Sequence, residues 1–169
     1  LLKTGAYGMI RFVVPLFPSV SVQFAPWAMT LGAIGILYGA VLAFGQNDFK
    51  RLVAYTSVSH LGFVLMGIYA FNEIALQGAL LEMICHGLST PALFILAGML
   101  QEQLHTRDMN RLGGLWHDAP RMGGVAMFFA VASLGLPGLG NFVGEILILI
   151  GTFGANRPAA IVGAIGLVG

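Results

Sequence analysis

The sequence predicts an all-α fold, a polytopic membrane helix bundle with one discontinuous helix broken near residues 136–140, and three observations support it. Hydrophobic residues make up 57% of the chain and charged residues only 9%, whereas a soluble domain carries roughly a quarter charged residues. The mean hydropathy is +0.87. The apolar residues also form runs close to the roughly 20 residues that a helix needs to cross the hydrocarbon core of a bilayer.

Six apolar segments, separated by short joins that are polar or contain proline, are predicted as membrane spans. They cover about residues 1–17, 27–44, 52–71, 74–100, 122–153 (interrupted) and 159–169. The joins are expected at residues 18–26, 46–51, 72–73, 101–121 and 154–158. Because the first and last segments read as the interiors of helices, we expect residues 1–169 to be a single fragment of a larger membrane domain.

The basic residues predict how the bundle is oriented. Loops 46–51 and 101–121 are separated by two spans and therefore lie on the same side of the membrane. Together they hold most of the basic residues, namely Lys50, Arg51, Arg107, Arg111 and Arg121. The positive-inside rule places this side in the cytoplasm, and a bacterial cytoplasmic (inner) membrane is the expected location.

Composition and spacing exclude several function classes. The net charge is +1 and basic clusters are lacking, so a nucleic-acid partner is not expected. The single cysteine, Cys85, lies in an apolar run and supports neither a disulfide nor an iron–sulfur site. The histidines do not have zinc-motif spacing and the few acids are scattered, so no metal site is expected. No serine or cysteine nucleophile has a matching base, and no phosphate-binding loop follows a strand.

Four ionisable residues are predicted to lie deep in the membrane on four different spans: Lys3, His60, His86 and Glu145. At a helical rise of about 1.5 Å per residue, His60 lies roughly 15 Å beyond Lys50, and His86 lies midway along its own span. A charge at such a depth costs at least about 2.5–3.5 kcal/mol, so each residue is a functional candidate. Lysine, histidine and glutamate exchange protons, and a row of them across several helices predicts a hydrated proton path without redox chemistry of its own.

Other polar residues are expected to support this path together with trapped water. They are Tyr55, Ser57, Ser59, Glu82, Ser89 and Thr90. Glu82 and His86 are four residues apart and face the same way on a helix, so they can share a proton or form an ion pair, and a structural pairing is an equal alternative. The polar residues also have a second interpretation as hydrogen-bonding contacts between helices, which for His60 is as good as the functional one.

The run LGLPGLGNFVGE at residues 134–145 predicts the break in the fifth span. Pro137 and the glycines around it interrupt the helix, and the backbone groups freed there must be buried in protein or hydrated. A half-helix then starts near Asn141, a candidate N-cap, with Glu145 near its first turn. The partial positive charge of the helix start favours an ionised acid, whereas burial favours a neutral one. Glu145 is therefore predicted to be the titrating group of an exit gate.

Five motifs resemble one known family of membrane proteins over essentially the whole chain. They are DFKRLVAYTSVSHLG (48–62), HGLS (86–89), HTRD (105–108), GGLW (113–116) and GLGNFVGE (138–145). The first is similar to the signature of the antiporter-like subunits of complex I, the proton-pumping NADH:quinone oxidoreductase, and its core is shared with cation/proton antiporter subunits. The other four resemble the chain M (mitochondrial subunit four) branch in particular. The acid at Glu145 favours this branch, because chains L and N place a lysine at that position.

By this resemblance the full protein is a fourteen-helix bundle with two inverted five-helix repeats, and this chain runs from the eighth helix into the thirteenth. Lys3 matches the lysine that links the two half-channels, and His60 and His86 match the central histidines. Glu145 matches the terminal acid on the broken twelfth helix. Glu82 stands where a neutral polar residue such as glutamine is expected, so the resemblance assigns it no role.

The function implied is proton translocation as a subunit of NADH:quinone oxidoreductase, driven by electron transfer from NADH to quinone in other subunits. No cofactor is expected on this chain, because NADH, FMN, the iron–sulfur clusters and quinone belong to other subunits. The expected partners are chains L and N on either side, the lipid bilayer and protons. The alternatives are a subunit of a multisubunit sodium/proton antiporter or membrane-bound hydrogenase, and a structural scaffold, which the depth of Lys3 and Glu145 disfavours.

Overall fold

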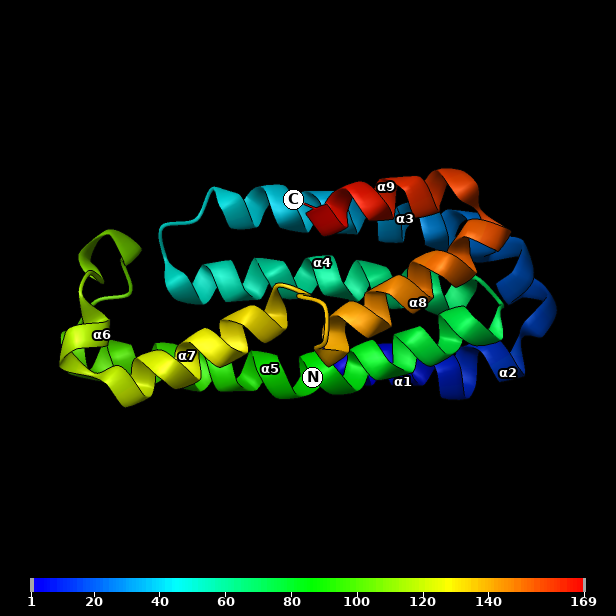
Figure 1. Cartoon of the computed structure of the whole chain (residues 1–169). Coiled ribbons are helices and arrows are strands. Elements are labelled where there is room, and N and C mark those ends of the chain that lie inside the picture. Colours follow the sequence, from blue (N-terminus) through cyan, green and yellow to red (C-terminus); the bar gives the residue numbers. More distant parts are fainter. Residues whose placement is uncertain (1, 169) are drawn as a thin grey trace.

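The computed structural model describes residues 2–168, apart from the side chains at positions 115, 118 and 168, and this range is almost entirely helical. The elements are α1 (Leu2–Gly8), the π-helical turn η1 (Met9–Val13), α2 (Val14–Leu16), α3 (Pro18–Phe44), α4 (Phe49–Tyr69), α5 (Glu73–Leu104), the 3₁₀ turn η2 (Met109–Arg111), α6 (Leu115–Asp118), α7 (Pro120–Ser133), α8 (Gly140–Ala155) and α9 (Arg157–Val168) (Figure 1). The predicted all-α bundle is therefore confirmed. Leu1 and Gly169, the ends of the first and last predicted spans, lie outside the described residues.

The two loops rich in basic residues lie at the same end of the bundle, as predicted. Figure 1 shows the α3–α4 turn and the segment between α5 and α7 at the left, and the α4–α5 and α8–α9 turns at the right. An antiparallel bridge between Asp48 and Asp108 joins the two loops directly. Helices α3, α4 and α5 are each long and apolar enough to cross a membrane, so the chain is an integral membrane protein.

Helices α4 and α5 both start at a side-chain cap. The Asp48 carboxylate accepts hydrogen bonds from the backbone N–H groups of Lys50 and Arg51, at 2.9 and 3.1 Å. The Asn72 side chain does the same for Ile74, at 2.9 Å, at the start of α5. Such caps satisfy backbone donors that no helical turn can reach, and they define where the two helices that carry most of the deep polar residues begin.

The predicted break in the fifth span lies between α7 and α8. Helix α7 ends at Ser133, and residues 134–139 form a turn before α8 begins. Gly135 and Gly138 have φ values of +64° and +99°, a left-handed region that glycine adopts without steric cost. As a result α7 runs from one end of the bundle to its middle, and α8 continues from there to the other end (Figure 1).

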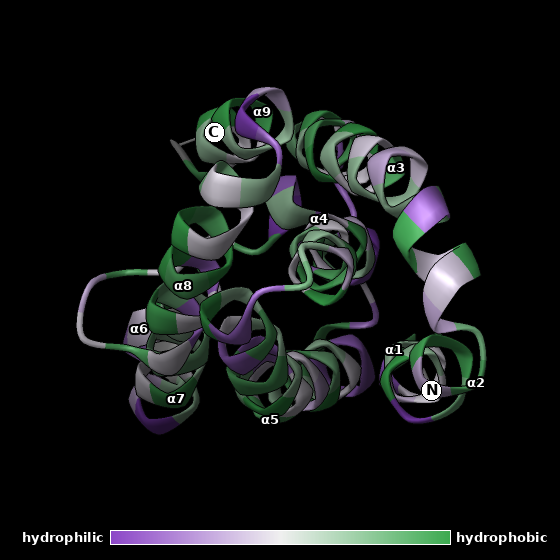
Figure 2. Cartoon of the chain, turned by 90° about the vertical axis from the view of Figure 1, so that its right-hand side faces the viewer, coloured by the Kyte–Doolittle hydropathy of each residue, from purple (hydrophilic) through white to green (hydrophobic). Residues whose placement is uncertain are grey.

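Helix α4 lies at the centre of the bundle. It packs against α1, α3, α5, α8 and α9, and Figure 2, a view along the helices, shows them around it. Its Phe63, Val64 and Met66 side chains are buried and join Ile36 of α3 and Ile148 of α8 in the main apolar core. A polar side chain on the inward faces of α4 is therefore surrounded by protein.

Close contact between α3 and α4 depends on glycines. A Cβ atom placed on Gly39 would lie 2.6 Å from the backbone nitrogen of Ser59, and one on Gly62 would lie 2.5 Å from the carbonyl oxygen of Gly32. Small residues at such positions let two helix backbones approach, which is how helices associate in a membrane.

The predicted join at residues 18–26 is wrong, because this segment is the beginning of α3. Two prolines suggested a loop. Pro18 occupies the first helical turn, where its missing N–H has no helical partner to lose. Pro26 lies inside the helix, and there the Thr30 hydroxyl donates a hydrogen bond to the Pro26 carbonyl oxygen at 2.8 Å. The chain instead bends at Phe17, whose φ and ψ are −130° and 59°.

Gly39→Ala should destabilise the bundle by about 1–3 kcal/mol, the usual cost of overpacking, because the new methyl group would meet the α4 backbone. The measurement is the thermal midpoint and the yield of the assembled membrane complex carrying the variant. Gly35→Ala is the matched control, since the nearest atom to its Cβ would be 3.9 Å away. Equal behaviour of the two variants would contradict the close α3–α4 contact.

Candidate functional site

The four residues predicted to lie deep in the membrane meet at one place in the middle of the bundle. Lys3 comes from α1, His60 from α4, His86 from α5 and Glu145 from α8. Glu82 of α5 joins them and is 0% exposed, while His86 and Glu145 are each 2% exposed. The structure thus brings together residues that lie up to 142 positions apart in the sequence, and it places a fifth ionisable group among them.

At one side of this cluster, Lys3 contacts His86. The Lys3 ammonium nitrogen Nζ lies 2.7 Å from His86 Nδ1, so it can donate a hydrogen bond to the lone pair of that nitrogen. The Thr90 hydroxyl, one turn further along α5, lies 2.8 Å from the same Nδ1 atom. Thr90 was expected to support the path, and its contact fixes the orientation of the His86 ring.

At the other side, His60 lies between two carboxylates. Its Nδ1 atom is 2.8 Å from Glu145 Oε1 and 3.2 Å from Glu82 Oε1. The N–H direction is not aligned with either oxygen, so neither contact has hydrogen-bond geometry. The His60 and His86 rings touch edge to face, with centroids 4.7 Å apart. A continuous line of contacts therefore runs from Lys3 through His86 and His60 to Glu145.

Glycines allow α8 to approach α5 closely enough for these contacts. A Cβ on Gly144 would lie 2.9 Å from Glu82 Oε2, and one on Gly151 would lie 2.6 Å from the Ala75 backbone nitrogen. On α5, a Cβ on Gly78 would lie 2.7 Å from the Gly144 carbonyl oxygen. The small residues recurring along α8 are a sequence signal for this helix contact, which the sequence analysis missed.

The predicted supporting residues on α4 lie close to the cluster but serve the helices. The Ser57 hydroxyl donates to the Val53 carbonyl oxygen of its own helix at 2.9 Å. The Ser59 hydroxyl donates to the Ile36 carbonyl oxygen of α3 at 3.1 Å. Tyr55 is only partly buried, and the structure does not bring it into the line from Lys3 to Glu145. On α5, Ser89 is buried and its hydroxyl makes no hydrogen bond within the described residues.

The interpretation of Asn141 as a helix cap is wrong. Helix α8 begins at Gly140 after the extended residue Leu139, and no side chain caps it. Asn141 lies inside the first turn, 2% exposed, with an Nδ2 atom that lacks a hydrogen-bond partner among the described residues. Glu145 lies in the second turn rather than the first, so the helix dipole, which acts mainly within one turn, has little influence on it.

The break and the acid are close in space as well as in sequence. A Cβ on Gly135 would lie 2.7 Å from Glu145 Oε2, so the turn that contains Pro137 passes directly beside the carboxylate. A cavity of about 250 Å³ adjoins His60 and Glu145 and is lined in part by Thr56, Ser59 and Leu134. This volume has room for several water molecules, each of which takes roughly 30 Å³ in the liquid.

His60, Glu82 and Glu145 also form the one group, within the described part of the chain, whose ligand atoms are close enough to share a metal ion, all within 4.8 Å. Spacing along the sequence predicted no metal site, because each of these residues comes from a different helix. One histidine nitrogen and two carboxylates are suitable ligands for zinc. A proton bound to His60 can equally supply the positive charge that balances the two carboxylates, in place of a metal ion.

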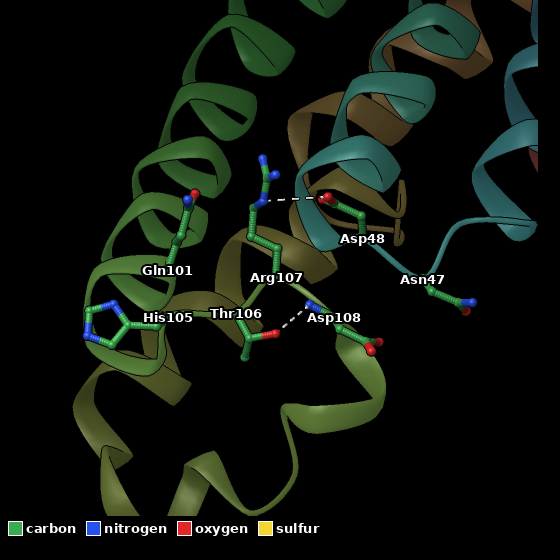
Figure 3. Close-up of a pocket in the computed structure, with 7 residues that line it drawn as sticks. All are labelled: Asn47, Asp48, Gln101, His105, Thr106, Arg107 and Asp108. Atoms are coloured by element: carbon green, nitrogen blue, oxygen red, sulfur yellow. Dashed lines mark hydrogen bonds and ion pairs between the residues drawn. The ribbon is translucent and has the colours of Figure 1, made fainter.

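A second, exposed site lies at the end of the bundle, where the basic loops meet (Figure 3). The cavity there has a volume of about 430 Å³ and is lined by Asn47, Asp48, Gln101, His105, Thr106, Arg107 and Asp108. Arg107 Nε lies 3.5 Å from Asp48 Oδ2, and the Phe49 N–H donates to the Arg107 carbonyl oxygen at 3.1 Å. The His105 ring points away from this pair in Figure 3. These contacts clamp the start of α4 to the segment after α5.

Sequence comparison identifies the family. A family model described as "NADH:quinone oxidoreductase/Mrp antiporter, TM" matches residues 1–168. The chain belongs to this family of membrane subunits. It is 61% identical over 168 residues to NADH-quinone oxidoreductase subunit M of Pseudomonas aeruginosa and 56% identical to that of Escherichia coli K12, in each case over 99% of this chain and 33% of the relative. The chain therefore spans about a third of the length of these relatives.

Solved structures of family members have the same fold. A chain of respiratory complex I from Thermus thermophilus with bound NADH superposes with a TM-score of 0.94 at 35% identity, over 98% of this chain and 36% of that chain. A chain of the Mrp complex from Dietzia sp. DQ12-45-1b gives a TM-score of 0.91 at 23% identity, over 98% and 31%. The predicted antiporter-like fold and the resemblance to the chain M branch of complex I are thereby confirmed.

Asp48→Ala should lower the stability of the chain by about 1 kcal/mol, because the start of α4 loses its cap while the exposed pair with Arg107 contributes little. The measurement is the thermal midpoint of the assembled complex. Asp48→Asn keeps an oxygen that can cap the helix and removes only the charge, so it should stay close to the wild type. A similar loss in both variants would show that the ion pair, not the cap, stabilises this end.

Proposed function

We propose that this chain forms the proton-translocating part of a membrane subunit of NADH:quinone oxidoreductase, of the subunit M type. The observation that supports the proposal most strongly is the line of contacts that runs from the partly buried Lys3 through the buried His86 and His60 to Glu145. Scaffold proteins have no need of such a line, because neutral polar residues join membrane helices at lower cost than buried charges.

The geometry suggests how a proton moves. The Lys3 ammonium gives a proton to His86 Nδ1, 2.7 Å away, and becomes a neutral amine. The two histidine rings touch edge to face, so a water molecule bridging their ring nitrogens would carry the proton from His86 to His60. After a small rotation of its ring, His60 gives its Nδ1 proton to Glu145 Oε1, 2.8 Å away, and the carboxylic acid formed there lies beside the break at Gly135. Imidazole suits this relay because it takes a proton on one ring nitrogen and gives one from the other.

The driving force would come from outside this chain. NADH, FMN, the iron–sulfur clusters and quinone belong, in this proposal, to other subunits, and this chain contributes no redox step. Its partners would be the neighbouring antiporter-like membrane subunits, chains L and N. The basic loops at 46–51 and 101–121 would face the cytoplasm of a bacterium whose inner membrane holds the complex.

Glu145→Gln and Lys3→Ala should each lower NADH-driven proton transport several-fold per assembled complex, because each removes a proton carrier at one end of the line. The measurement uses sealed membrane vesicles that contain the full complex, with the quinone reductase rate and proton uptake recorded together. Glu102→Gln, on the exposed end of α5, is the matched control and should behave as wild type.

Three results would contradict the proposal. Both rates could remain at the wild-type level in the two variants. The substitutions could reduce only the amount of assembled complex and leave turnover per complex unchanged, as a scaffold requires. Finally, a wild-type gradient that depends on sodium, with protons moving in the opposite direction, would indicate a sodium/proton antiporter.

A further inference from the structure

Glu82 belongs to the buried cluster, but the proposed proton path from Lys3 to Glu145 does not use it. Its side chain is 0% exposed, and neither carboxylate oxygen has a hydrogen-bond partner among the described residues. Among the described residues, its close polar contact is with His60 Nδ1, 3.2 Å from Oε1. A structural glutamate that joined two helices would be expected to accept hydrogen bonds from donors on them, so this arrangement favours a role in the proton chemistry.

Glu82 faces ionisable groups from each neighbouring element that carries one. His60 of α4 is in contact with it, and Glu145 of α8 has a carboxylate oxygen within 4.8 Å. Lys3 of α1 and Cys85 of α5 lie close enough to interact with it electrostatically, and His86 lies one helical turn away on α5. The Glu82 carboxylate fits against α8 because Gly144 has no side chain there. The ionisable residue that α8 contributes to this site is Glu145. Its ionisable neighbours are therefore groups that can bind or release a proton.

Charge balance gives Glu82 a distinct effect on the cluster. When Lys3 and His60 both carry a proton, the cluster holds two positive charges, and Glu82 and Glu145 together neutralise them. Without Glu82, one of these positive charges would be uncompensated in a medium where an isolated charge is costly. With Glu82 present, Glu145 can become protonated while His60 still has a carboxylate beside it.

We propose that Glu82 is a second proton acceptor for His60 and alternates with Glu145 in that role. This inference rests on the proposed function. His60 Nδ1 lies 2.8 Å from one acid and 3.2 Å from the other, and its N–H is aligned with neither. A small rotation of the ring therefore decides which oxygen receives the proton.

The proton transfer is balanced and reversible for both acids. The Nδ1–H bond breaks, an O–H bond forms on Glu82 Oε1 or Glu145 Oε1, and a neutral imidazole and a carboxylic acid replace the ion pair. The two acids differ in where a proton goes next. Glu145 lies beside the break at Gly135, on the way out, whereas Glu82 lies one helical turn from His86 and returns its proton to the histidines. Glu82 thus stores a proton inside the cluster while Glu145 releases one.

The test compares Glu82→Gln and Glu82→Asp in the full complex in sealed vesicles, with Glu102→Gln as the exposed control on the same helix. Glu82→Gln keeps the size and polarity of the side chain and should lower proton transport several-fold per assembled complex. It should also change the pH profile of transport and remove one carboxyl band from the redox-induced infrared difference spectrum. Glu82→Asp keeps a titrating group and should restore part of the transport rate.

Wild-type transport and a wild-type pH profile in Glu82→Gln would overturn this inference, as would a loss of assembled complex with unchanged turnover and pH profile. If Glu82→Gln fails to assemble, the pH profile of Glu82→Asp decides: a changed profile supports the inference and a wild-type profile overturns it. The proposed function is judged separately. A normal rate in Glu145→Gln would contradict the function, whereas a slow Glu145→Gln with a normal Glu82→Gln would contradict only the role of Glu82.

Discussion

The structure depends above all on the cost of placing ionisable side chains in the middle of a membrane. An uncompensated charge there is unfavourable by at least about 2.5–3.5 kcal/mol, yet this chain buries two histidines and two glutamates together beside a lysine. They are tolerated because opposite charges and proton-accepting groups lie within about one hydrogen-bond length of one another. Bringing so many of these groups to one place is favoured where helix backbones lie close together, as several do in this bundle.

Glycines allow this close approach at the contacts between the helices that carry the cluster and their neighbours. Gly39 and Gly62 bring α3 against α4, and Gly78 and Gly144 bring α5 against α8. Gly67 brings α4 against α5, since a Cβ on it would lie 2.8 Å from the Ala75 carbonyl oxygen. The three helices that carry His60, Glu82 and Glu145 therefore form one tightly packed unit. The end clamp at Asp48 and Arg107 adds a second constraint, because it links the start of α4 to the segment that leaves α5. The depths of the proton-carrying groups relative to one another are consequently defined by the backbone.

Much of this could be predicted from the sequence, for reasons of length and depth. Apolar runs revealed the spans, and counting residues from Lys50 placed His60 at mid-membrane. The sequence could not predict features that depend on the rotation of a helix about its axis or on how closely two helices approach. The position of Glu82 against His60 is of this kind, because it requires Gly144 to face it on another helix. The prediction for Asn141 was wrong because a sequence break locates the start of a half-helix only to within a few residues. Since α8 begins at Gly140, Asn141 lies inside the first turn and not at the cap position.

In the proposed function, the packed unit of α4, α5 and α8 and the break between α7 and α8 would have different roles in proton movement. Since α4, α5 and α8 pack tightly against one another, the proposed transfer among His60, Glu82 and Glu145 would need only side-chain rotation, because His60 Nδ1 lies 2.8 and 3.2 Å from the two acids. The break works differently. Residues 134–139 carry two glycines with positive φ, so α7 and α8 are joined by a turn and not by a continuous helix. Because the same turn lies against Glu145, the conformation of the break would set the access of water to that acid, whereas the contact of Glu82 with His60 lies between α4 and α5. In the proposed function, the release and the storage of a proton would therefore depend on different parts of the chain.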